Sequence, residues 1–314
     1  MNNDQKTYTP MITITIPCRN EEANCVGIAE AVVRQLERVG ERFEIIFIDN
    51  ASDDRTVELI RELCSRDQRI KLIINTRNYG QMRSPTHAIF QARGQAVIAM
   101  CADFQDPPEL IPEFINRWRH GADIVLGVRL SEKSPPVLAM FRKLSYSLAR
   151  KFSDYPIISN ATGFGLFDRK VVGAIAEIKE PEPFFRGLLV ETGYKIETVS
   201  YHRPPRAGGK TNNNFFALLD FAMSSLAGSS RRLLRVPLFL SVISFGVCLL
   251  TVSMAFVALA IGAPVSAWLI ASTIELQFAL LFFSVGLIAV QVGLISERTR
   301  KTPLVVERER VNFD

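Results

Sequence analysis

The chain has 314 residues, which is enough for one large domain with an appendage. Its five cysteines form no C-x-x-C pair and have no histidine at metal-ligand spacing, which argues against a disulfide framework and a zinc site. The formal net charge is +5, but the basic clusters lie beside apolar stretches, a placement that favours anionic lipid headgroups over nucleic acid. Met1–Pro10 is polar and lacks the apolar core of a signal peptide, so we expect the N-terminal part to stay in the cytoplasm.

The first 130 residues alternate between short apolar runs and stretches of helical period. The runs are rich in Ile and Val and are bounded by polar or turn residues, as buried parallel strands are. They are Met11–Pro17, Phe43–Asp49, Ile70–Asn75, Ala96–Cys101 and Ala122–Gly127. This alternation predicts an α/β domain with a parallel sheet covered by helices on both faces. Ligands of such sheets bind beyond the carboxyl ends of the strands.

The C-terminal third has a different composition, because no charged residue lies between Arg235 and Glu275. Leu238–Ala260 and Thr273–Ile295 are each about as long as a helix that spans a bilayer, roughly 20 residues. Arginines and a lysine flank the two segments on their outer ends, so the positive-inside rule predicts a hairpin with both ends in the cytoplasm. The alternative is a buried helical hairpin in a large soluble core.

Two further segments have an apolar face with cations around it, namely Pro136–Phe152 and Phe215–Leu234. Helices on the bilayer surface and helices that pack on the sheet both explain this pattern, and closeness to the hairpin favours the bilayer surface. The predicted organisation is a cytoplasmic catalytic domain over residues 1–213 and a juxtamembrane amphipathic helix over 214–235. Two transmembrane helices follow over 236–296, and a cytoplasmic tail over 297–314.

The loops after the first two predicted strands carry polar residues that suit a nucleotide. The first contains Pro17, Arg19 and Glu21 and lacks the G-x-G-x-x-G pattern, which counts against NAD or FAD. The second strand ends at Asp49, whose carboxylate can accept a hydrogen bond from a ribose hydroxyl or a base N–H. Asp53 or Asp54 in the following loop is also explained as a cap of the next helix.

The fourth predicted strand is followed by Asp103 and Gln105, whose hard oxygen atoms suit a divalent cation. Their spacing predicts that both side chains lie on one side of an extended segment. A metal held there would neutralise the charge of a diphosphate leaving group. An Asp-rich turn that caps the helix starting at Pro107 explains Asp106 equally well.

Four motifs fall in order along the chain: Pro17-Cys18-Arg19-Asn20-Glu21-Glu22, Ile48-Asp49-Asn50-Ala51-Ser52-Asp53-Asp54-Arg55-Thr56, Arg77-Asn78-Tyr79-Gly80 and Ala102-Asp103-Phe104-Gln105-Asp106-Pro107-Pro108-Glu109. Together they resemble the family 2 glycosyltransferases of Rossmann-like GT-A fold. With the predicted hairpin, the chain is similar to the polyprenyl-phosphate branch, which includes the bactoprenol glucosyltransferases and dolichol-phosphate mannose synthase. The resemblance covers essentially the whole chain.

The resemblance implies a role for each matching position. Pro17, Arg19, Glu21 and Asp49 would bind the nucleotide-sugar, with Arg129 near the donor. Asp103 and Gln105 would hold Mg²⁺ or Mn²⁺. Arg203, Arg206 and Lys210 would contact the phosphates, and Asp103, Arg206 and Lys210 are the expected catalytic residues.

Three departures from the family pattern bear on this assignment. Cys101 replaces the first acidic residue of the metal motif, and a thiol suits Mg²⁺ poorly. Asp49-Asn50-Ala51 stands where Asp-Asp-Gly is usual. Asn160–Leu166 lacks the acidic and arginine residues of many relatives, which fits an acceptor that needs no general base, such as a lipid phosphate with a second pKa of about 6. Arg117-Trp118 lies too early for the Q-x-x-R-W motif of processive synthases.

The sequence therefore predicts a metal-dependent, inverting transferase that moves a sugar from a nucleotide-sugar to a polyprenyl (undecaprenyl) phosphate. UDP is favoured over GDP by analogy with bacterial members. The expected location is the cytoplasmic face of the bacterial inner membrane, in a multi-pass homo-oligomer such as a tetramer. Two alternatives remain: a catalytically weakened nucleotide-sugar-binding or scaffold protein of the same fold, and a membrane-tethered transferase with a soluble acceptor.

Overall fold

The structure is a computed structural model that describes residues 11–130, 158, 160–181, 183–202, 204, 266–299 and 303–313. These residues belong to two compact units. The first unit holds the described residues up to 204 together with 303–313, and the second holds residues 266–299. Pro136–Phe152, Phe215–Leu234 and Leu238–Ala260 lie outside the described residues, so the helices predicted there stay predictions.

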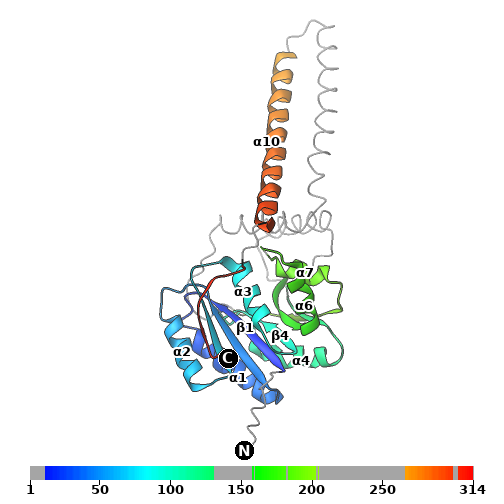
Figure 1. The fold of residues 1–314 in the computed structure, drawn as a ribbon. Helices are drawn as coiled ribbons and strands as arrows, with labels where there is room; N and C mark the ends of the chain where they lie inside the picture. Colours follow the sequence, from blue (N-terminus) through cyan, green and yellow to red (C-terminus); the bar gives the residue numbers. More distant parts are fainter. Residues whose placement is uncertain are drawn as a thin grey trace, which may run out of the picture. The chain divides into compact units, whose positions relative to one another are not determined.

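The first unit is built on an eight-stranded sheet with the order β7-β5-β6-β4-β1-β2-β3-β8 (Figure 1). The strands are β1 (Ile12–Cys18), β2 (Phe43–Asp49), β3 (Ile70–Asn75), β4 (Ala96–Ala99), β5 (Ile124–Arg129), β6 (Ala161–Asp168), β7 (Ile196–Tyr201) and β8 (Glu307–Val311). β1 pairs in parallel with β2 and β4, and β2 pairs in parallel with β3. The sheet as a whole is mixed, because β6 runs antiparallel to β4 and β5, and β8 antiparallel to β3. The parallel pairing expected of the early strands is thus confirmed, but it does not extend to the two antiparallel strands from later in the chain.

Helices cover both faces of this sheet, as expected. They are α1 (Cys25–Val39), α2 (Thr56–Arg66), α3 (Gly80–Gln91), the short η1 (Pro108–Leu110), α4 (Ile111–Arg119), α6 (Arg169–Ile178) and α7 (Phe185–Glu191). Residues of α1, α2 and α4 form one buried cluster with the sheet, and residues of α3, α6 and α7 form another. Neighbouring residues of one strand enter opposite clusters, as the alternation of strand side chains requires: Ile45 belongs to the first and Ile46 to the second.

The first helix shows how the local sequence produces this packing. Ile28, Val32 and Leu36 repeat at helical spacing and are fully buried against the sheet. The helix ends at Gly40, whose φ of 77° is in the left-handed region that glycine adopts without strain. Truncating Leu36 to alanine would leave a cavity and cost about 2–5 kcal/mol of stability.

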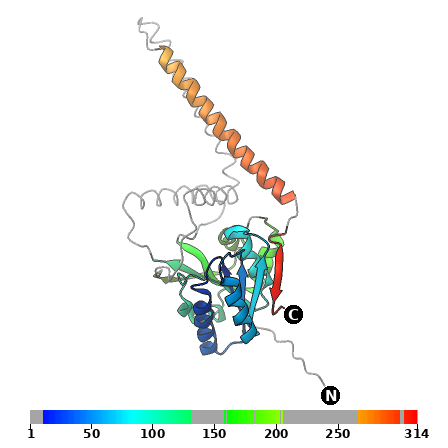
Figure 2. The ribbon, with the colours of Figure 1, turned by 90° about the vertical axis from the view of Figure 1, so that its left-hand side faces the viewer.

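The C-terminal residues add a strand that the sequence analysis did not predict. Residues 297–314 were assigned to a tail, but β8 lies along β3 at the edge of the sheet, where it is drawn in red in Figure 2. Val305, which precedes β8, is 4% exposed, and Val311 packs against the cluster of α1, α2 and α4. The last described segment is therefore an integral part of the first unit.

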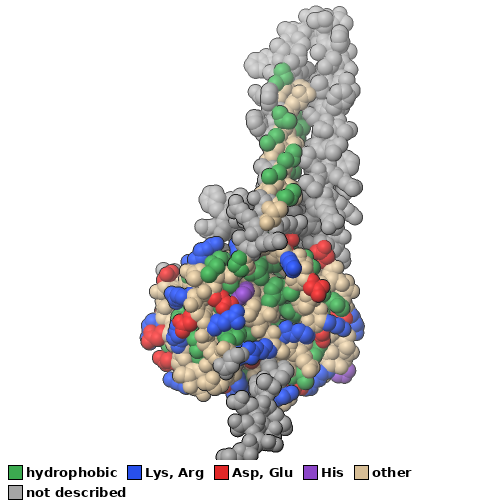
Figure 3. All heavy atoms as spheres, viewed as in Figure 1, with side chains coloured by type: hydrophobic (Ala, Val, Ile, Leu, Met, Phe, Trp, Pro, Cys, Tyr) green, Lys and Arg blue, Asp and Glu red, His purple; other side chains and the backbone are tan. Residues whose placement is uncertain are grey.

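The second unit contributes one described helix, α10 (Ser266–Thr299), which includes the predicted segment Thr273–Ile295. Large apolar side chains between 47% and 59% exposed lie along it: Ile274, Leu276, Leu281, Phe283, Val285, Ile288, Val292 and Ile295 (green in Figure 3). Among the helices of the described residues, none combines the length and the apolar content that crossing a bilayer requires.

Candidate functional site

The strand order brings most of the predicted site residues to one edge of the sheet. β1 lies between β4 and β2, so the chain crosses from one side of β1 to the other at this point, and such crossover points are where open α/β sheets bind ligands. The residues in question stand at or just beyond the carboxyl ends of β1, β2, β4 and β5. They are Pro17, Arg19 and Glu21, then Asp49, then Asp103 and Gln105, and lastly Arg129.

Direct hydrogen bonds join the loops after β1 and β2. The Asn20 N–H donates to Ser52 Oγ over 2.9 Å, and the Asp53 N–H donates back to Asn20 Oδ1 over 2.9 Å. The Glu21 N–H donates to Thr56 Oγ1 over 2.8 Å. Asn20 has a φ of 56°, a left-handed conformation that Asn adopts more readily than most residues. The two loops therefore form one rigid structure.

Asp49, the last residue of β2, is fully buried. Its two oxygens accept hydrogen bonds from the Ser52 N–H and the Ser52 hydroxyl. Burial raises the pKa of Asp49, while the hydrogen bonds from Ser52 and the charge of Arg308 act in the opposite direction. Asp49 thus positions Ser52 in this structure, and direct contact with a nucleotide stays a prediction.

Asp54 does not occupy the N-cap of α2, as one interpretation of the sequence expected, because that position is Arg55 and α2 has no side-chain cap hydrogen bond. The Asp54 carboxylate accepts a hydrogen bond from the N–H of Thr56, the first residue of the helix, over 3.0 Å. The same carboxylate accepts the Glu22 N–H over 3.2 Å, which gives a further link between the first two loops. Asp54 therefore serves loop structure and helix start together.

Asn50, one of the departures from the expected family pattern, connects the second loop to the third. Its side-chain amide donates to Asn78 Oδ1 over 2.7 Å and to the Gly80 carbonyl over 3.2 Å. Its oxygen accepts the Tyr79 N–H over 2.8 Å and the Asn75 amide over 3.3 Å. The sequence indicated only that Asn50 departs from the family pattern. The structure shows that an amide suits this position, because the side chain both donates and accepts hydrogen bonds.

Two arginines at the sheet edge each have a buried Nε that forms no hydrogen bond within the described residues. Within the described residues, the buried side-chain polar atoms without a partner are Arg19 Nε, Arg129 Nε and Asn75 Oδ1. A buried N–H left unpaired costs about 1–3 kcal/mol, so a ligand that supplies oxygen acceptors would be stabilised here. Glu21, by contrast, is buried and accepts from the Asn24 amide over 2.7 Å, and Pro17 lies half-buried in β1. The arginines are therefore the best placed of the predicted donor-binding residues.

The segment after β4 is a turn, so the expectation of an extended segment with Asp103 and Gln105 on one side is wrong. Phe104 has a φ of 60°, and the Gln105 N–H donates to Asp103 Oδ1 over 3.2 Å. The reason is packing: the half-buried Phe104 ring contacts the buried cluster of α1, and a Cβ placed on Gly27 would lie 3.3 Å from it. Asp103 and Gln105 are both half-buried on this turn.

Asp106 holds the same turn from inside the protein and does not cap a helix. It is 2% exposed, and it accepts hydrogen bonds from the Cys101 N–H over 3.0 Å and from the Tyr201 hydroxyl over 3.1 Å. Burial raises the pKa of Asp106, and the hydrogen bonds and the nearby Arg129 charge oppose this rise. The capping interpretation is wrong because η1 has no side-chain cap.

The described residues include no group of three or more His, Cys, Asp or Glu side chains that could hold a metal ion. Asp103 and Gln105 still fit a magnesium-type ion, because such ions are held by one or two protein oxygens and complete their shell with substrate phosphates and water. Cys101 is exposed at the start of the turn. Arg203, Arg206 and Lys210, the predicted phosphate-binding residues, lie outside the described part of the chain.

Comparison with known protein families decides what kind of site this is. The sequence model of one family, described as glycosyl transferase family 2, matches residues 13–175, just over half of the chain. The chain belongs to glycosyl transferase family 2. It is therefore a transferase, and the matched residues contain β1 to β6 with the loops described above.

Individual relatives extend the similarity beyond the family domain. A prophage bactoprenol glucosyl transferase homolog of Escherichia coli is 30% identical, over 93% of this chain and 94% of that protein. A bactoprenol glucosyl transferase of Shigella phage SfX is 33% identical, over 74% of this chain and 78% of that protein.

Solved structures show the same fold. Glucosyl-3-phosphoglycerate synthase from Mycobacterium tuberculosis, crystallised with Mn²⁺, UDP and phosphoglyceric acid, matches with a TM-score of 0.50 at 16% identity. The match covers 69% of this chain and 76% of that one. The catalytic unit thus has the GT-A fold that the sequence predicted.

Proposed function

We propose that this glycosyltransferase moves a sugar from a nucleotide-sugar to a polyprenyl phosphate at a membrane surface. The observation that carries the proposal is the extent of the bactoprenol glucosyl transferase similarity. The family model ends at residue 175, but the match to the E. coli relative covers 93% of the chain. The chain therefore shares with that relative the C-terminal part that the family domain lacks.

The geometry of the sheet edge supports a nucleotide diphosphate as the donor. Arg19 and Arg129 supply buried N–H groups that have no partner within the described part of the chain. Charge-assisted bonds from guanidinium groups to phosphate oxygens are among the stronger hydrogen bonds in proteins. The interlocked loops after β1 and β2 offer a rigid surface for the nucleoside. We propose UDP as the nucleotide, in line with the bacterial relatives.

Asp103 and Gln105 would hold Mg²⁺ or Mn²⁺ together with the donor phosphates. When bound, such a cation neutralises the charge that develops on the leaving diphosphate. Asp106 and Phe104 keep the turn that carries these ligands in place. Arg206 and Lys210 are proposed to stabilise the same charge from the segment outside the described residues.

A phosphate acceptor matches the residues of this site. Its oxygen attacks the anomeric carbon as the bond from that carbon to the nucleoside diphosphate breaks, and the bond electrons leave with the diphosphate. One displacement of this kind inverts the anomeric configuration. A phosphate monoester with a second pKa of about 6 is largely deprotonated at neutral pH, so no general base has to remove a proton.

We propose that the second unit and the segments next to it bring the enzyme to the lipid. The exposed apolar side chains of α10 support contact with a non-aqueous phase. The transmembrane hairpin over 236–296, the cytoplasmic orientation, the bacterial inner membrane and a homo-oligomer such as a tetramer remain parts of this proposal.

Acceptor competition tests the proposed function. The full-length protein is incubated in lipid nanodiscs with radiolabelled UDP-sugars, undecaprenyl phosphate and an excess of free sugars. The expected product partitions into the organic phase and forms only when the lipid phosphate is present. Label in soluble oligosaccharide would instead support the tethered transferase with a soluble acceptor. Donor binding without any turnover would support the scaffold protein.

A further inference from the structure

The C-terminal strap, residues 303–313, is attached to the first unit by more than its strand pairing. Arg61 of α2 forms a bidentate ion pair with Glu309, with one contact of 2.6 Å. The Asn312 amide donates to the carbonyls of Cys64 and Ile70, each over 2.8 Å. The strap is therefore anchored at the α2 side of the sheet, away from the loops of the candidate site.

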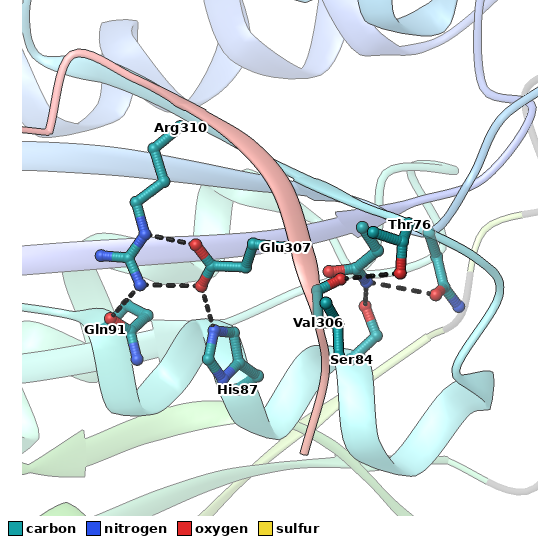
Figure 4. Close-up of polar contacts among 9 residues, drawn as sticks. Thr76, Ser84, His87, Gln91, Val306, Glu307 and Arg310 are labelled. Carbon is teal, nitrogen blue, oxygen red and sulfur yellow. Dashed lines mark hydrogen bonds and ion pairs between the residues drawn. The ribbon is translucent and has the colours of Figure 1, made fainter. Parts of the chain in front are cut away.

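On the other face, the strap is attached to α3 through Glu307. Figure 4 shows the Glu307 carboxylate between Arg310 of the strap and His87 of α3. His87 Nε2 lies 2.5 Å from Glu307 Oε1, and Arg310 also donates to Gln91 of α3 over 2.9 Å. Both the carboxylate and the imidazole are mostly shielded from water, so water competes little for the hydrogen bond between them.

The start of the strap contacts the third loop of the donor site directly. The Val306 carbonyl accepts hydrogen bonds from the Thr76 N–H over 3.0 Å and from the Thr76 hydroxyl over 3.1 Å (Figure 4). The Arg83 guanidinium donates to the carbonyls of Leu304 and Pro303 over 2.8 and 2.9 Å. These four polar contacts would be lost if the strap left its place on β3.

Tyr79 transmits these contacts to the second loop. Its hydroxyl lies 3.1 Å from Thr76 Oγ1, and the Arg83 guanidinium carbon lies 5.3 Å from its ring centroid, within cation–π range. Its backbone N–H is one of the donors to Asn50, the residue after Asp49. The path from strap to donor loop thus runs from Leu304 through Arg83 and Tyr79 to Asn50.

We propose that the C-terminal strap positions the donor loops, and that Arg83 is the positioning residue that transmits its docking to Tyr79 and Asn50. This inference rests on the proposed nucleotide-sugar site. The strap follows the second unit in the chain, because residues 300–306 connect Thr299 of α10 to Glu307 of β8. Donor binding would then depend on the segment that comes directly after the second unit. Undocking of the strap weakens nucleotide binding and leaves the chemical step unchanged.

The test measures UDP affinity in the presence of Mn²⁺ by calorimetry on the full-length protein. Arg83→Gln removes the fork that reaches both strap carbonyls, and we expect the Kd to rise about tenfold, equivalent to about 1.4 kcal/mol. In turnover assays the donor KM should rise likewise, while kcat and the KM for the lipid acceptor stay at wild-type values. A purely structural role would instead lower the amount of active enzyme and hence kcat.

Arg61→Glu provides a second route that leaves the third loop untouched, because it repels Glu309 on the far side of the strap. It should also raise the Kd for UDP, and the reversed pair Arg61→Glu with Glu309→Arg should restore it. Arg34→Ala on α1, which removes an exposed arginine paired with Glu30, is the matched control. We expect it to stay within about twofold of wild type, as surface substitutions usually do.

The outcomes separate the two proposals. A wild-type protein that binds no nucleotide contradicts the proposed function and this inference with it. Wild-type binding that is unchanged in Arg83→Gln and in Arg61→Glu contradicts the inference alone. If Arg83→Gln does not fold, the charge-reversal pair decides the matter, because a Kd that fails to rise in Arg61→Glu while strap amides exchange faster with deuterium overturns the proposed coupling.

Discussion

The half of the candidate site formed by the loops after β1, β2 and β3 and the half proposed to hold a metal are kept in place in different ways. The loops after β1, β2 and β3 are joined to one another by side-chain hydrogen bonds that centre on Ser52 and Asn50. The turn after β4 is held by contacts of another kind. Phe104 packs it against the hydrophobic core, and Asp106 ties it to Tyr201. We therefore expect a substitution in the first half to disturb all three of its loops. A substitution in the second half should disturb only the turn after β4.

The largest effect is expected from Asp103→Ala, which removes the carboxylate proposed to hold the metal. Transfer should fall below detection, since a catalytic cation supplies several kcal/mol of transition-state stabilisation. The thermal midpoint should stay near wild type, because Asp103 contributes one local hydrogen bond. Glu109→Ala, a nearby exposed acid, is the control and should transfer normally. Normal transfer by Asp103→Ala in Mg²⁺ would remove Asp103 from the metal site.

Asn50→Asp should have the next largest effect, because a carboxylate cannot donate the two hydrogen bonds that the Asn50 amide donates. A carboxylate can still accept a hydrogen bond from the Tyr79 N–H. Its other oxygen, however, would lie against two further acceptors, Asn78 Oδ1 and the Gly80 carbonyl oxygen. Asn78 cannot relieve this by turning its amide, since its oxygen also accepts the Gly80 N–H over 2.9 Å. We expect an increase in donor KM of about tenfold, the cost of roughly one unpaired buried group. A variant with wild-type donor KM would show that the loops are not coupled through Asn50.

Tyr201→Phe tests the local support of the metal-binding turn. It removes the hydroxyl that donates to buried Asp106 and should lower the free energy of unfolding by about 1–2 kcal/mol in urea titrations. The metal concentration for half-maximal activity should rise while the donor KM is unchanged, because the change stays within this half of the site. A rise in donor KM as large as that of Asn50→Asp would contradict the separation of the two halves.

Cys101→Asp introduces, at the start of the same turn, the acidic residue that the resemblance to the family implies. Since Cys101 is exposed there, an added hard oxygen should lower the metal concentration for half-maximal activity by about 10-fold or less. Cys101→Ser, which adds no charge, is the matched control. An unchanged metal titration would mean that this side chain does not face the site.

The smallest effect concerns pH and the strap. Burial raises the pKa of Glu307, but its hydrogen bonds with Arg310 and His87 outweigh burial and set the pKa below its ordinary value. A carboxylate with a depressed folded pKa stabilises the protein above the unfolded pKa of about 4.3, and this contribution is lost as pH falls through the folded pKa. Gln91, the α3 residue that accepts a hydrogen bond from Arg310, carries no charge.

Glu307→Gln should therefore be less stable than wild type by about 1 kcal/mol at pH 7. The difference should shrink below the unfolded pKa of about 4.3, where wild-type Glu307 becomes protonated too. Urea titrations of both proteins at several pH values measure it. A difference that stays constant down to acid pH would show that the Glu307 charge does not hold the strap.

The sequence predicted the central strands well because each is a short, mostly apolar run that is largely buried on both sides. β2 and β3 have the predicted bounds, and β1, β4 and β5 differ by at most two residues. β8 was missed because Glu-Arg-Glu-Arg-Val has no apolar period, and its place depends on partners far away in the chain such as Arg61 and His87. The alternation of acid and arginine after Val305-Val306 was the available signal.

The site was predictable where residue type alone limits the role, and not where the backbone decides it. Asp103, Gln105 and Arg129 lie at the expected sheet edge because β4 and β5, which precede or contain them, run in the same direction as β1. The turn at Phe104 could not be read from the spacing of Asp103 and Gln105, since it depends on a ring packing beside Gly27. The roles of Asn50 and Asp106 likewise depend on groups from other loops and strands.

The most direct test of the account is to identify both products of one turnover. With UDP-sugar and undecaprenyl phosphate, the account predicts UDP in the aqueous phase. Mass spectrometry should find a lipid that has gained one sugar and no phosphorus, with the anomeric configuration inverted. Release of UMP with a lipid diphosphate-sugar would contradict it, because the sugar–phosphate bond of the donor would then have stayed intact. Release of UDP and free sugar alone would contradict the lipid phosphate as acceptor.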